Sequence, residues 1–127
     1  PQGQGDATSR RPRRLRRARL ELSVTAIEVA AADEFPPGSS KIVHHGTRFV
    51  GVYNCGGELY AIEDRCSHDD GPLCEGDWDE DLCRVICPRH GSAFDLATGT
   101  PRSLPATEPV ETYPVSVVDG TIVLDLP

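Results

Sequence analysis

The chain has 127 residues, which is enough for one ordinary domain and too few for two. Hydrophobic residues make up 38% of it, with 12 glycines and 11 prolines, a composition that favours a turn-rich, mostly β protein. No run of 18 apolar residues occurs, so the sequence excludes a helix that spans a membrane.

The net charge of −7 is divided unevenly along the chain. Residues 1–20 contain seven arginines and one acid, whereas residues 21–127 carry a balance of −13. The basic segment has almost no apolar side chains to bury, so we expect a disordered Arg-rich tail over residues 1–20. A targeting peptide is the alternative, and the missing initiator Met suggests a truncated or tagged chain.

The same tail bears on localisation and on partners. No long apolar stretch follows Arg10 and Arg11, which excludes a twin-arginine export signal, so we expect a soluble protein of the cytoplasm. The acidic remainder repels phosphate backbones and suits a basic protein partner, so no specific nucleic-acid binding is expected.

Alternation of apolar and polar residues, together with β-rich segments around turn residues, predicts strands on both sides of an irregular central stretch. Dipeptides His45-Gly46, Gly56-Gly57 and Asp119-Gly120 indicate tight turns between neighbouring strands. A loop is expected over residues 30–40, and no helix longer than about two turns is expected. The predicted strands cover residues 22–29, 40–44, 47–54, 58–62, 82–86, 110–118 and 121–126.

The irregular stretch, residues 63–99, contains two short motifs that each offer one thiolate and one imidazole. They are Cys66-Ser67-His68 and Cys87-Pro88-Arg89-His90, with eighteen residues between His68 and Cys87. A cluster with two thiolates on one iron and two imidazoles on the other requires this equal division. Nearby glycines and prolines supply the bends that such loops need.

These motifs closely resemble those of the Rieske iron–sulfur family. The matching stretches are residues 57–64, 66–73, 87–95 and 98–99, and the resemblance extends over roughly residues 21–127. It implies an all-β fold of stacked antiparallel sheets, with a small cluster-binding subdomain at about 64–99. It also implies a Rieske-type [2Fe–2S] cluster held by Cys66, His68, Cys87 and His90.

A zinc site with two Cys and two His is the alternative, or no metal at all. Zinc sites usually open with two cysteines two to four residues apart, so the Cys-x-His opening favours the cluster. A zinc protein would be redox-inert and colourless, and would act as a structural or interaction module.

The remaining cysteines receive simpler interpretations. The count is odd, at five, which argues against a disulfide framework, and Cys55 and Cys83 are predicted to be buried apolar fillers. Cys74 is not needed as a ligand. High-potential members of the family join the two cluster loops by a disulfide, and the corresponding positions here are Gly71 and Arg89, so that bridge cannot form.

Several polar and aromatic residues near the motifs have two interpretations. Asp69 and Asp70 either solvate their loop or tune the cluster and dock a partner. The pair His44 and His45 is expected to be solvated at a turn, and Trp78 to serve packing.

The neighbours of the cluster predict its reduction potential. Rieske potentials span roughly −150 to +300 mV. Three features argue for a potential in about the bottom third of that range: the acidic domain, the missing bridge, and Phe94 in place of a tyrosine. The Ser92 hydroxyl argues for a higher potential, because it could donate a hydrogen bond to a cluster sulfur.

The resemblance implies a ferredoxin of a multicomponent non-haem iron oxygenase, which takes single electrons from a flavoprotein reductase and passes them to the terminal oxygenase. Such a protein is an electron-transfer component with no catalytic residues of its own. The alternative is an accessory ferredoxin linked to iron–sulfur assembly or redox sensing. A nitrite reductase small subunit typically lacks the four ligands, and membrane cytochrome complexes are disfavoured by the missing anchor and bridge.

Overall fold

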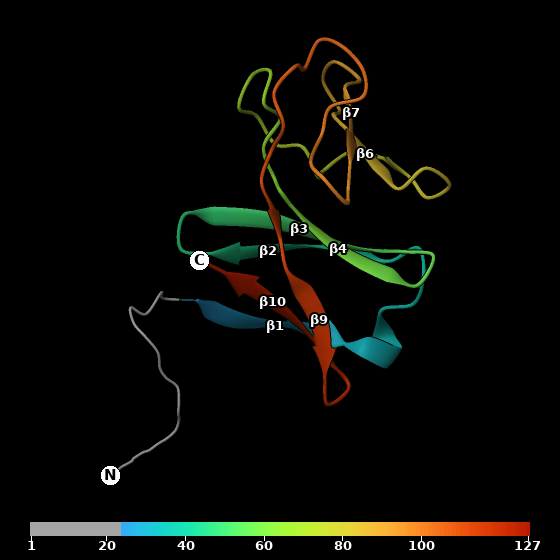
Figure 1. The fold of residues 1–127 in the computed structure, drawn as a ribbon, viewed down its shortest axis with the longest axis vertical. Coiled ribbons are helices and arrows are strands. Elements are labelled where there is room, and N and C mark those ends of the chain that lie inside the picture. Colours follow the sequence, from blue (N-terminus) through green and yellow to red (C-terminus); the bar gives the residue numbers. More distant parts are fainter. Residues whose placement is uncertain (1–23) are drawn as a thin grey trace.

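The fold consists of three antiparallel sheets stacked along the long axis of the molecule (Figure 1). The structure is a computed structural model, and it describes residues 24–127. The expected Arg-rich tail therefore lies outside the described residues. Within these residues no helix is long and apolar enough to cross a membrane.

The first sheet joins the beginning and the end of the described chain. Strand β1 (Thr25–Ala31) pairs with β10 (Thr121–Leu126), which in turn pairs with β9 (Val115–Val118). Asp119 and Gly120 connect β9 to β10, and both have positive φ values, of 51° and 79°. Such values match the right-handed twist of a two-residue hairpin, so this predicted turn is confirmed.

The second sheet has the order β2–β3–β4–β8, and it is built from β2 (Ser40–His45), β3 (Arg48–Cys55), β4 (Glu58–Glu63) and β8 (Thr112–Tyr113). A short 3-10 helix, η1 (Ala32–Glu34), leads from β1 toward β2. The β2–β3–β4 meander follows the predicted strands to within a residue or two, and its central strand β3 is buried on both faces from Val50 to Cys55.

The third sheet is smaller and forms one end of the molecule, above the other two in Figure 1. It has the order β5–β6–β7, from β5 (Trp78–Asp79), β6 (Arg84–Ile86) and β7 (Ala93–Asp95). The two Cys–His motifs lie in the loops before β5 and between β6 and β7.

Two separate hydrophobic cores hold these layers together. The lower core lies between the first two sheets and includes Val50, Val52 and Leu124. The upper core lies beneath the Cys–His motifs and includes Leu73 and Phe94, both fully buried. The predicted all-β architecture of stacked antiparallel sheets is confirmed. The bounds of the cluster-binding subdomain, about 64–99, stay a prediction.

Two details of the strand prediction are wrong. The single strand expected over 110–118 is two strands, β8 and β9, which belong to different sheets. Pro114 separates them, since proline has no N–H to donate to a ladder. Strands β5 and β7 were not predicted, because two or three residues are too few to show alternation.

Candidate metal centre

The two Cys–His loops, residues 66–71 and 87–92, have the same backbone hydrogen-bond pattern. In each, the cysteine N–H donates to the carbonyl five residues later, at Gly71 (2.8 Å) and at Ser92 (2.8 Å). In each, the N–H four residues after the cysteine donates back to its carbonyl, from Asp70 (2.7 Å) and from Gly91 (3.0 Å). Two unlike sequences therefore form matching loops.

The residue that closes each loop is in the left-handed region of backbone conformation. Asp70 has a φ of 61° and Gly91 a φ of 77°. Glycine reaches this region without strain, and aspartate is among the few other residues that tolerate it. The turn residues thus fix the direction in which each cysteine and each histidine leaves the backbone.

The loops bring like donors together. The thiols of Cys66 and Cys87 are buried, and they are close enough that Cys87 raises the pKa of the Cys66 thiol. The rings of His68 and His90 are exposed, and their centroids are 5.1 Å apart in an edge-to-face arrangement. All four residues expected to be ligands are therefore brought together, with the sulfurs inside and the imidazoles at the surface.

The chemistry of this donor set fits a cluster better than a single ion. Over residues 24–127, no group of three or more His, Cys, Asp or Glu side chains is arranged to hold one metal ion. A tetrahedral zinc ion would need all four donors around one point. A two-iron cluster needs a thiolate pair and an imidazole pair, which is the division observed here.

Burial and backbone N–H groups have opposite effects on the Cys66 thiol, and burial dominates, so its pKa is raised overall. Burial raises the pKa of the Cys66 thiol, while the N–H groups of His68 and Asp69 lower it. Backbone N–H groups that point at sulfur stabilise the thiolate, which is the form that binds metal.

A third segment, residues 100–110, packs against both Cys–His loops. The Ser67 hydroxyl donates to the Glu108 carbonyl at 2.5 Å, which ties the segment to the first loop. The N–H of Ala106 donates to the hydroxyl oxygen of fully buried Ser92 at 3.0 Å, which ties it to the second. The Ser92 hydroxyl hydrogen is not used in that bond, so its donation to a cluster sulfur stays a prediction.

A salt bridge connects the two Cys–His loops directly. The Arg89 guanidinium donates through Nε and Nη2 to the two carboxylate oxygens of Asp69, both at 2.8 Å. Its Nη1 donates to the carbonyl of Pro72 at 2.9 Å. This contact holds the pKa of Asp69 well below its usual range, so Asp69 is more than a solvated loop residue.

Asp70 has a different neighbour. It accepts a hydrogen bond from Arg65 at 2.7 Å, and Arg65 also pairs with Glu63. Asp70 therefore belongs to a surface ion-pair network on the first loop.

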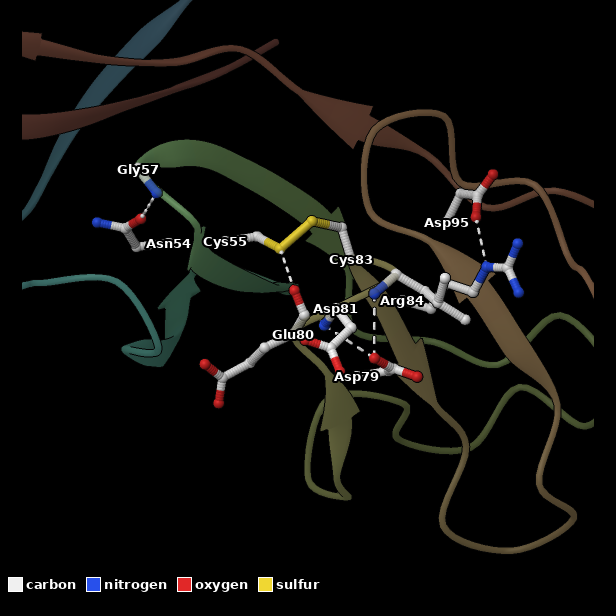
Figure 2. Close-up of a disulfide and its surroundings, with 10 residues drawn as sticks. Asn54, Cys55, Gly57, Asp79, Glu80, Asp81, Cys83, Arg84 and Asp95 are labelled. Atoms are coloured by element: carbon white, nitrogen blue, oxygen red, sulfur yellow. Dashed lines mark hydrogen bonds and ion pairs between the residues drawn. A yellow bond between two sulfur atoms is a disulfide. The ribbon is translucent and has the colours of Figure 1, made fainter.

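The interpretation of Cys55 and Cys83 as unpaired fillers is wrong. They form a disulfide that joins the end of β3 to the turn before β6, with a Cα–Cα distance of 5.9 Å (Figure 2). Cys83 has a φ of 54° and lies in a turn rather than in the strand expected there. An odd cysteine count argues against a complete framework of bridges, but it does not exclude a single one.

The other predicted roles agree with the structure. Trp78 packs edge-to-face on Tyr53 with centroids 5.0 Å apart, and it contributes to the upper core. His44 and His45 are exposed near the β2–β3 turn, where His44 stacks on Phe49. Cys74 is a free, buried cysteine whose pKa is raised to about 12, mainly by burial.

Comparison with known proteins identifies the family. The model of the Rieske [2Fe-2S] domain matches residues 25–114, which is well over half of the chain. The chain belongs to the Rieske [2Fe–2S] family. Its cofactor is accordingly a Rieske-type [2Fe–2S] cluster, and the zinc alternative is rejected.

Relatives of this Rieske protein include a 3-phenylpropionate/cinnamic acid dioxygenase ferredoxin subunit of Escherichia coli K12. That protein is 50% identical over 78 residues, which cover 61% of this chain and 73% of the relative. The same subunit from Shigella flexneri serotype 5b gives the same identity and coverage.

Solved structures of ferredoxins have the same fold. The ferredoxin of carbazole 1,9a-dioxygenase from Nocardioides aromaticivorans IC177 superposes with a TM-score of 0.72 at 37% identity, over 81% of this chain and 98% of that one. The Sphingomonas yanoikuyae B1 ferredoxin gives 0.71 at 30% identity, over 81% and 100%. A complex of reduced oxygenase and oxidised ferredoxin in carbazole 1,9a-dioxygenase includes a chain that matches with a TM-score of 0.72 and 37% identity, over 78% of this chain and 91% of that one.

Proposed function

We propose that this Rieske protein is the ferredoxin component of a multicomponent non-haem iron dioxygenase. In this role it carries single electrons from a flavoprotein reductase to a terminal oxygenase and catalyses no reaction by itself. Relatives that are 50% identical are ferredoxin subunits of dioxygenases, and a similar chain occurs in a solved complex of oxygenase and ferredoxin. The finer proposal, a flavoprotein as the electron donor, rests on the resemblance alone.

We further propose that Cys66 and Cys87 bind one iron and that His68 and His90 bind the other. The pairing of buried thiols and exposed imidazoles on two matching loops is the observation that carries this assignment. Bound there, the cluster supplies reversible one-electron chemistry. The exposed rings of His68 and His90 provide the route for electrons to a partner, since they are the donors that reach the surface.

The ligand assignment is tested by spectroscopy on purified, anaerobically handled protein. We expect about two irons per chain, visible colour, and a reduced-state paramagnetic resonance spectrum whose average g-value is lower than that of all-thiolate clusters. Replacing His68 or His90 by Cys should move the spectrum toward all-thiolate values or abolish the cluster. An unchanged spectrum in either variant would remove that histidine from the ligand set.

The electron-transfer role is tested by reconstitution. Reduced protein is mixed with a purified aromatic-ring dioxygenase, and turnover is followed by product formation with and without this ferredoxin. We expect product only when the ferredoxin carries its cluster. A fully loaded ferredoxin that supports no turnover with any oxygenase would favour the accessory role in iron–sulfur assembly or redox sensing.

The cytoplasmic location predicted from the sequence belongs to the same proposal. The Cys55–Cys83 disulfide weighs against it, because structural disulfides are rare in reducing compartments. Rapid acid quenching and thiol alkylation in whole cells would measure the oxidised fraction of this pair where the protein resides.

A further inference from the structure

Arg89 lies between the two Cys–His loops and contacts both. It forms a two-pronged ion pair with Asp69 and a hydrogen bond to the Pro72 carbonyl, which attaches it to the first loop and the residue that follows it. It is itself part of the second loop, one residue before His90. The same Nη2 atom lies 3.6 Å from the sulfur of Cys87, within hydrogen-bonding range for sulfur.

Gly71 leaves the space that the guanidinium occupies. A Cβ atom added to Gly71 would lie 2.5 Å from the Cζ and Nη2 atoms of Arg89. Any side chain at position 71 would therefore displace Arg89 from the first loop.

We propose that Arg89 is a positioning residue that fastens the two Cys–His loops together and also raises the reduction potential by placing a positive charge against Cys87. This inference rests on the proposed ligand set, and it assigns a function to an ion pair outside that set. Asp69 has the complementary role: it anchors the guanidinium and partly offsets its charge.

The two parts of the proposal have distinct physical causes. The fastening depends on the geometry of the Arg89 guanidinium, because its two parallel N–H···O bonds to Asp69 define the relative orientation of the two loops, which a single contact does not. Tuning depends on charge, because reduction adds an electron, and hydrogen bonds or positive charge near the sulfur favour the reduced state. Removing either partner weakens the fastening by eliminating the ion pair, but the two removals change the local charge in opposite directions.

The experiment compares holoprotein of five variants with the wild type: Arg89→Gln, Asp69→Asn, the double variant, Gly71→Ala and Arg102→Gln. Arg102 is the matched control, because it forms an exposed ion pair with Asp95 that does not join the two loops. Reduction potential is measured by protein-film voltammetry. Iron release is followed by a chelator assay, and the urea midpoint of each variant checks folding.

Arg89→Gln should lower the potential, because it removes a positive charge beside Cys87. Asp69→Asn should raise it, because it removes a negative charge while the hydrogen bond to the Pro72 carbonyl keeps Arg89 close to Cys87. The double variant should be close to the wild type. All three should release iron roughly tenfold faster, as expected when an outer partner of a metal ligand is lost. Gly71→Ala, which changes no charge, should release iron faster and lower the potential, because it moves Arg89 away from Cys87. Arg102→Gln should release iron at the wild-type rate.

Potentials that move in the same direction in Arg89→Gln and Asp69→Asn would overturn the tuning. Iron release equal to that of the Arg102→Gln control would overturn the fastening. A wild-type protein that binds no iron or shows all-thiolate spectra would instead refute the ligand assignment, so the two failures are distinguishable.

Discussion

Removal of the Cys55–Cys83 disulfide is expected to lower the free energy of unfolding substantially. The two cysteines are 28 residues apart, and closing a loop of that length removes conformational entropy from the unfolded chain. At 25 °C the loss corresponds to about 3.6 kcal/mol. A domain of this size has a total stability of only about 5–15 kcal/mol, so this bridge supplies a large fraction of it.

The assay is urea unfolding of the wild type and of Cys55→Ala/Cys83→Ala, followed by circular dichroism with and without a phosphine reductant. The reductant should lower the wild-type midpoint toward that of the double variant and leave the double variant unchanged, which controls for effects of the reductant on the cluster. Equal midpoints for wild type and double variant would show that the bridge does not constrain the unfolded chain, and would refute the reasoning.

Three further predictions concern the stability of the folded domain. Leu124→Ala should lower the free energy of unfolding by about 2–5 kcal/mol in urea titrations, because Leu124 is fully buried in the lower core; a loss below about 1 kcal/mol would contradict that packing. Asn54→Ala should cost about 1–3 kcal/mol in the same assay, since it leaves the Phe35 carbonyl and the Gly57 N–H without the partner they have now, and a cost near zero would contradict these two hydrogen bonds. Arg102 and Arg84 lower the pKa of Asp95. The stability from these ion pairs is therefore complete above the ordinary aspartate pKa of about 3.9, and it is lost as the pH falls below that value through the lowered folded-state pKa. Between pH 7 and pH 3 the urea midpoint of Asp95→Asn should fall less than that of the wild type, and an equal fall would contradict the assignment.

The local signals in the sequence predicted most of the fold. Alternation identified β4 and β10, and β-rich segments around a turn identified β2 and β3, all to within a residue or two. The short strands β5 and β7 are defined by their pairing with β6. Such pairing between separate segments produces no periodic pattern of apolar residues in the sequence. The division of 110–118 could have been expected from Pro114.

The four candidate ligands were predicted from short motifs and not from strand patterns. The Cys-x-His and Cys-x-x-His motifs are local, and the structure brings their four donors together as expected. Two features were missed because they join distant segments: the pairing of Cys55 with Cys83 and the contact of Arg89 with Asp69. An arginine between the proline and the histidine of one motif, with acids after the histidine of the other, was the available signal for the second.

The hairpin of β3 and β4 supplies side chains to both cores. Along β3, Val50 and Val52 belong to the lower core, whereas Tyr53 and Cys55 belong to the upper one. On β4, the neighbours Ala61 and Ile62 divide in the same way. The β3–β4 hairpin therefore lies between the two cores and contributes side chains to each of them.

Because the two cores share this hairpin, the stability of each core depends on the other. Heat or denaturant that separates β3 from β4 disrupts the upper and the lower core together. The cluster-binding end should therefore unfold together with the first two sheets. Loss of visible colour and loss of sheet structure should consequently occur as one event when the protein is unfolded.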